Sequence, residues 1–327
     1  MARPSSGGSL KRGLDRYAVH PHEHVVHPGI ITTLLPHLDQ QRAHEFRIAL
    51  LAGLVLVAGL YAFGFVGAAL LASAALVPML YLLYLHDSGL SRAEPLRVIG
   101  LTLGLGAGLG VVVSIVINIV SGYAAPVRPG GLGARFDFGG VFFLAVLVPV
   151  VQEALKPLPA LLLRQPTDSE RKTLDGFVFG VAAGLGYALA ETVVGYAGVI
   201  RAIDLRISSG NWLYLLITAA ILLPLLQGTA TGVITAALWR RRPQSVPGTQ
   251  NPTAIGVAVA AHIAFVLGSV FIVAAGAAFP VRIIWQALIV AGLLIYARYF
   301  LHHALLDHLA GGGQPTRPTE QPIGART

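Results

Sequence analysis

Four residues that could do chemistry lie in long apolar stretches of this 327-residue chain. Glu153 and Lys156 fall in "VPVVQEALKPLPALLL", residues 148–163, Glu191 follows a glycine-rich stretch, and His262 lies in "AAHIAFV". An ionisable side chain at the bilayer centre costs roughly 3 kcal/mol on insertion scales, so such residues are functional candidates. Two carboxylates and a histidine around membrane-buried water could hydrolyse a bond. One carboxylate would be the general base, and the histidine would donate to the oxyanion or protonate a leaving amine.

Other chemistries fit the sequence less well. Three of these residues could ligate zinc, but the chain has no HExxH pair, and it has no Gly-x-Ser-x-Gly elbow for a serine nucleophile. It has no cysteine, which excludes a disulfide framework and a thiolate site. We therefore expect no metal and no other cofactor. A structural ion pair without catalysis is the remaining alternative for these charges.

The composition indicates that these residues are positioned by membrane-spanning segments. Hydrophobic residues make up 55% of the chain, charged residues 12%, and the mean hydropathy is +0.71, values that predict an integral membrane protein. The net charge of +8 fits cytoplasmic loops facing anionic lipid. No basic helix interleaved with aromatic residues is present, so we expect no nucleic-acid partner.

The apolar segments predict an all-α polytopic membrane protein with about eight transmembrane helices. Each segment is close to the ~20 residues needed to cross hydrocarbon. The predicted spans are 48–66, 67–85, 98–121, 138–163, 174–200, 212–239, 253–278 and 281–301. No polar residue separates the first two spans. If one tilted helix took their place, the number of spans would be odd and the two termini would lie on opposite sides of the membrane.

Charge bias predicts the orientation of the chain. With both termini inside, 17 Lys/Arg fall on the inner side, counting Arg298 near the end of the last span, and five on the outer side. We expect a multi-pass protein of a cell membrane, with a cytoplasmic polar tail over 1–47, a helical domain over 48–301 and a cytoplasmic tail over 302–327. The last residues are expected to be disordered.

Two further patterns carry less weight. Four histidines in "HPHEHVVH", residues 20–27, could hold a metal if the tail folded, but alternating Pro and His disfavours a packed shell. The chain shows no convincing repeat and no inverted pair of interrupted helices, which would indicate a secondary transporter.

Helical geometry predicts one polar site at mid-membrane depth. Glu153, Glu191 and His262 lie near the middles of their spans, and their depths agree within roughly 6 Å at 1.5 Å rise per residue. Two glycine ridges, one on each of two spans, should allow close packing. Their members are Gly100, Gly104 and Gly108 in one span and Gly176, Gly180 and Gly184 in the other.

The faces of these helices support the same site. Glu191 lies within about 20° of Gly180 and Gly184, so it should point at a neighbouring helix. Pro157 removes the amide that would bond the carbonyl of Glu153, which indicates water at this depth. Gln227 is also near the midplane and needs polar partners.

The quoted segments resemble the PrsW family of glutamic-type intramembrane proteases, related to the CAAX-protease superfamily. The resemblance rests on "QEALK", "LDGFVFGVAAGLGYALAE" and "AAHIAFV", within residues 152–266. It implies a mostly helical protease, with a core over about 138–278, that cleaves single-pass membrane proteins such as anti-sigma factors. It also implies catalytic roles for Glu153, Glu191 and His262, supported by Gln152, Lys156 and Gln227.

The chain departs from the family pattern at several positions. Gln152 stands in place of a first glutamate, Gln227 in place of an earlier histidine, and Val266 in place of an asparagine, while Tyr187 replaces a phenylalanine. A glutamine can donate a hydrogen bond but cannot accept a proton. An intramembrane endopeptidase is the first interpretation. An inactive homologue that binds or scaffolds membrane proteins, and a proton- or ion-coupled transporter, remain as alternatives.

Overall fold

The computed structural model describes residues 40–87, 96–121, 138–163, 172–197, 213–240 and 249–310. All regular secondary structure in these ranges is helical, which confirms the predicted all-α fold. Seven described segments are long and apolar enough to cross a membrane, and the remaining predicted span, 48–66, is a shorter apolar helix, Arg47–Ala62. The elements are α3 (Gln40–Ala62), α4 (Val66–Asp87), α5 (Leu96–Ser121), α6 (Phe138–Phe142), η2 (Phe143–Leu147), α7 (Val148–Leu155), α8 (Leu158–Leu162), α9 (Lys172–Gly195), η3 (Leu216–Leu222), α12 (Leu223–Trp239), α13 (Asn251–Ala274) and α14 (Phe279–Ala310).

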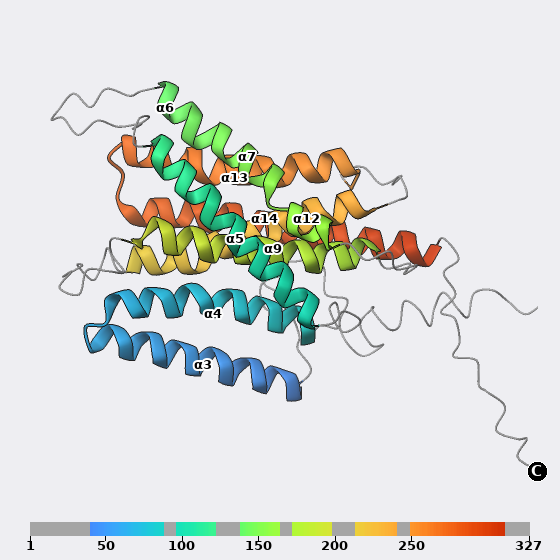
Figure 1. Ribbon diagram of the computed structural model, residues 1–327, viewed down its shortest axis with the longest axis horizontal. Coiled ribbons are helices and arrows are strands. Elements are labelled where there is room, and N and C mark those ends of the chain that lie inside the picture. The colour runs from blue at the N-terminus through green and yellow to red at the C-terminus, as the bar shows by residue number, and fades with distance from the viewer. Residues whose placement is uncertain are drawn as a thin grey trace, which may run out of the picture.

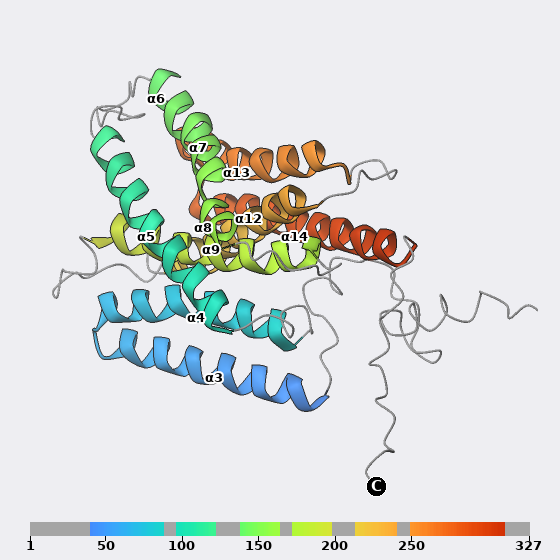
Figure 2. The same cartoon turned by 45° about the vertical axis from the view of Figure 1, so that its right-hand side comes forward.

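Helices α3 and α4 form a hairpin and lie side by side (Figures 1 and 2). The turn contains Gly64 at φ 81°, and the N–H groups of Gly64 and Phe65 bond the carbonyls of Tyr61 and Leu60, which is the Schellman pattern. The turn lies two to three residues before the boundary predicted at 66. Apolar residues run through it without a break, so hydropathy alone could not locate it.

Helix α9 is the centre of the bundle and packs between α5 and α12. Its small residues allow this close approach. A Cβ added at Gly180 or Gly184 would meet a carbonyl oxygen of α12 at 2.5 Å, so the predicted glycine ridge on this helix is confirmed.

The predicted ridge on α5 is wrong. A Cβ added at Gly100, Gly104 or Gly108 would meet nothing within 4 Å, whereas one at Gly110 would meet the backbone of α9 at 2.8 Å. Gly106 likewise faces the backbone of α9 at Ala183. Glycines alternate along this helix, so two series with a spacing of four exist, and the series at 106 and 110 is the one that faces α9.

The segment from α6 to α8 is a helix interrupted twice, and it runs beside α13 (Figures 1 and 2). Pro149 has no N–H for the carbonyl four residues earlier, and the preceding turn is the π-helix η2, where Val148 N–H bonds Phe143 O. Pro157 separates α7 from α8. The predicted break after Glu153 is therefore present.

The histidine group at residues 20–27 and the residues from 311 to the C-terminus lie outside the described ranges.

Candidate active site

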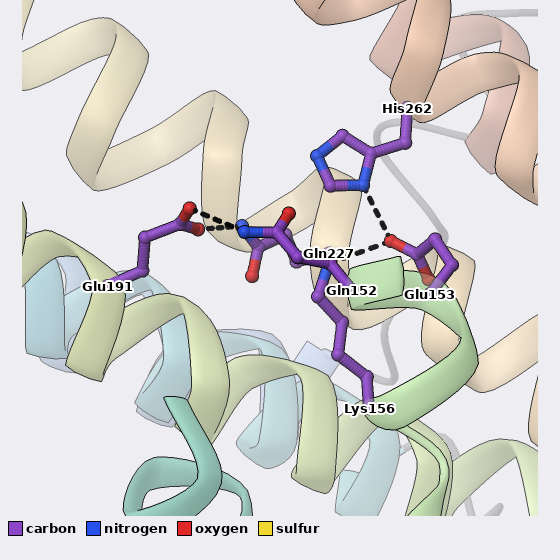
Figure 3. Close-up of polar contacts among 6 residues, drawn as sticks. All are labelled: Gln152, Glu153, Lys156, Glu191, Gln227 and His262. Atoms are coloured by element: carbon purple, nitrogen blue, oxygen red, sulfur yellow. Dashed lines mark hydrogen bonds and ion pairs between the residues drawn. The ribbon is translucent and has the colours of Figure 1, made fainter. Parts of the chain in front are cut away.

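Six polar residues from four helices meet between α7, α9, α12 and α13 (Figure 3). They are the six that the sequence singled out, and they form two hydrogen-bonded groups of three. One group is centred on Glu191 and the other on Glu153.

Glu191 of α9 accepts hydrogen bonds from two glutamines. Nε2 of Gln152, on α7, donates to Oε1 at 3.0 Å, and Nε2 of Gln227, on α12, donates to Oε2 (Figure 3). Hydrogen bonds to an ionised carboxylate are stronger than bonds between neutral groups. Two neutral amides therefore hold this carboxylate between two helices, and no cation among the described residues is paired with it.

Glu153 of α7 has charged surroundings. Its Oε1 accepts from Lys156 Nζ at 2.7 Å and lies 2.8 Å from Nδ1 of His262 on α13. All three side chains are buried, and Oε2 of Glu153 has no hydrogen-bond partner among the described residues. When Glu153 is ionised, Nδ1 of His262 is the donor, and the other ring nitrogen carries a lone pair when the imidazole is neutral and a proton when it is charged. Figure 3 shows that nitrogen turned away from Glu153.

Gln152 and Glu153 are adjacent in the sequence but belong to different hydrogen-bonded groups. Adjacent helical residues point about 100° apart, so the two side chains cannot face Glu191 together. The structure confirms this expectation, because Gln152 contacts Glu191 while Glu153 contacts His262.

The two glutamines are positioned by the same local arrangement. Gln152 follows Pro149 by three residues and the end of η2 by five, and Gln227 follows Pro224 by three and the end of η3 by five. The wider π-turn before each proline ends with an N–H to C=O bond spanning five residues, from Leu223 to Thr218 in the second case. The matching strings "VPVVQ" and "LPLLQ" are the sequence signal of this shared arrangement, and they are too short to stand out as a repeat.

The two carboxylates differ in access. Glu153 is 1% exposed, whereas Glu191 is partly exposed. A carboxylate paired with an ammonium ion is a weaker base than one that accepts only neutral donors. Glu191 is therefore better suited to activate water, while Glu153 is suited to stabilise a positive charge on His262.

The described part of the chain is a multi-pass helical membrane protein with one buried and one partly exposed carboxylate at one site, an arrangement suited to hydrolysis. Residues 94–297 match the model of a family described as PrsW family intramembrane metalloprotease. This match covers more than half of the chain, so the protein belongs to the PrsW family of intramembrane proteases. No curated protein and no solved structure matches it.

The family description names a metal, and the residues of this site do not fit one. The described residues contain no group of three His, Cys, Asp or Glu side chains placed to hold a metal ion. The ammonium group of Lys156 already lies 2.7 Å from Glu153, where a bound cation would meet like charge. Glu191 accepts from amide N–H groups on both oxygens.

Proposed function

We propose that this protein is an intramembrane endopeptidase that hydrolyses a peptide bond of single-pass membrane proteins with a water molecule activated by Glu191. The observation that carries the proposal is the contrast between the two carboxylates of one site. Glu191 is partly exposed and held by neutral donors, and Glu153 is buried beside Lys156 and His262.

The reaction assigns one proton transfer to each group. The water oxygen bonds to the carbonyl carbon, its proton passes to Glu191, and the carbonyl electron pair moves to the oxygen. As the carbonyl reforms, the C–N bond breaks and His262, in its protonated form, gives a proton to the amine. Glu153 supports that imidazolium through the 2.8 Å contact, and a later proton transfer from Glu191 to His262 restores the site.

The family and the predicted depth of the site support this substrate class. A site at mid-membrane level would reach a peptide bond inside a transmembrane segment, and anti-sigma-factor-like proteins are the class that the family resemblance suggests. The Lys/Arg distribution supports an orientation with both termini in the cytoplasm, and the family resemblance suggests a bacterial cell membrane.

Co-expression with candidate single-pass proteins would test the proposal. We expect cleavage by the native protein and none by Glu191→Gln, with the cut site read by mass spectrometry. Ser269→Ala is a matched control because it removes a buried hydroxyl from α13, bonded to Gln286, outside the site. It should keep the native cut site and rate.

One observation favours a second candidate function. Gln152 and Gln227 stand where the family resemblance places ionisable side chains, and both are neutral donors to Glu191. A membrane-protein binding or scaffold role would result if Glu191 serves only to join α7, α9 and α12. The same experiment separates the two, because a scaffold would be recovered with an uncut partner and Glu191→Gln would not change the partner's length.

A further inference from the structure

The hydroxyl group of Tyr187 is a polar group in the site that the reaction above does not use. Tyr187 lies on α9, one turn before Glu191, and about 40° away around the helix. Its side chain is fully buried, and its hydroxyl makes no hydrogen bond of regular geometry within the described residues. A buried hydroxyl without a partner destabilises a protein, so it calls for an explanation.

Tyr187 lies near both hydrogen-bonded groups of the site, the one centred on Glu191 and the one centred on Glu153. The ammonium group of Lys156 lies 5.0 Å from the centroid of its ring. The hydroxyl is close to the amide of Gln152, although the pair does not meet the geometry of a hydrogen bond, and Glu191 and Glu153 are the nearby charges. That amide already donates to Glu191 at 3.0 Å. The phenol oxygen is thus beside an N–H donor, and its own proton is available.

We infer that Tyr187, which replaces the phenylalanine of the family pattern, is a catalytic residue particular to this chain, whose hydroxyl donates a hydrogen bond to the oxyanion formed when water attacks the peptide carbonyl. This inference rests on the proposed function. When the O–C bond forms, the carbonyl oxygen takes the electron pair, and the phenol stabilises that charge while keeping its proton. The water's proton goes to Glu191, one turn away, so base and oxyanion donor come from one face of one rigid helix.

A structural role and a catalytic role for this hydroxyl predict opposite results. If it only packed, replacing it with hydrogen would leave the rate unchanged. If it donates to the transition state, Tyr187→Phe should lower kcat by about 10²-fold, the typical loss for one oxyanion donor. The substrate's KM should stay within about twofold, because the bond strengthens only as charge develops.

Tyr81→Phe is the matched control. Tyr81 lies on α4, and its hydroxyl has a partner, Oγ1 of Thr229, at 3.0 Å. This variant should lose thermal stability because it breaks a hydrogen bond, and it should keep the native kcat. Tyr187→Phe should show the reverse, with a Tm equal to or above that of the native protein.

Both variants would be purified, reconstituted in vesicles with a cleaved single-pass substrate, and compared by cleavage rate and Tm. A slow Tyr187→Phe with an undiminished Tm supports the inference. A full rate in Tyr187→Phe overturns it and leaves the proposed function standing, and a joint loss of rate and Tm overturns it in favour of a structural bond. Absence of cleavage by the native protein would refute the proposed function, and the inference with it.

Discussion

Gln152 and Gln227 occupy equivalent positions on two helices and donate to opposite oxygens of one carboxylate, that of Glu191. Each follows a π-turn and a proline at the same spacing. A π-turn changes the direction in which the following side chains point. The two irregular turns are therefore the means by which two helices aim an amide at the same group.

Changing Gln152 to glutamate should make the protein's stability depend on pH. Two carboxylates at hydrogen-bonding distance cannot both ionise at low cost, so the Gln152→Glu variant should lose stability relative to the native protein as the pH rises. Thermal unfolding in micelles at pH 6 and pH 9 would measure this. Gln152→Met, which loses the bond at every pH, should show a pH-independent deficit of about 1–3 kcal/mol. Equal deficits for both variants at both pH values would contradict the arrangement.

The packing of α9 on α12 should tolerate no side chain at Gly184. A Cβ there would meet the backbone oxygen of Gln227 at 2.5 Å, so Gly184→Ala should push the helices apart, displace Gln227, and cost about 1–3 kcal/mol together with most of the activity. Gly104→Ala is the control, because a Cβ at Gly104 meets nothing within 4 Å. Denaturation in mixed micelles and cleavage assays would compare them, and a native-like Gly184→Ala would be inconsistent with this contact.

The contributions of Lys156 and Glu153 to the free energy of unfolding should be coupled. Both are buried, so Lys156→Met leaves a carboxylate with its ammonium partner removed and should cost about 3–5 kcal/mol. Adding Glu153→Gln should recover a large part of that loss, because the uncompensated charge disappears. A double-mutant cycle of unfolding free energies measures the coupling. Additive effects would mean that the 2.7 Å ion pair contributes nothing.

Activity should not depend on a metal. The donor set at the site lacks three ligands that could meet on one ion within the described residues, so EDTA and 1,10-phenanthroline should leave the cleavage rate unchanged. A known zinc protease treated in parallel provides the control. Strong inhibition that added zinc reverses would refute this prediction and would turn Glu153, Glu191 and His262 into ligand candidates.

Residue spacing along the sequence predicted a large part of this arrangement. Composition and span length indicate a helical membrane protein, and the 100° rotation per residue correctly separates Gln152 from Glu153. Spacing could not choose between the two glycine series of α5, since the choice depends on which face meets α9. It also could not locate the π-turns, because the strings "VPVVQ" and "LPLLQ" that follow them do not specify a π-helical conformation before the proline. The buried hydroxyl of Tyr187 depends on tertiary packing in the same way.

The most direct test of the central claim is the cleavage rate of Glu191→Gln relative to the native protein, in vesicles that contain one single-pass substrate. The variant keeps the shape of the side chain and removes its ability to accept a proton. We predict a rate reduced by about 10²–10⁴-fold with substrate binding retained, the range expected for loss of a general base. A native rate of cleavage by Glu191→Gln would contradict the account.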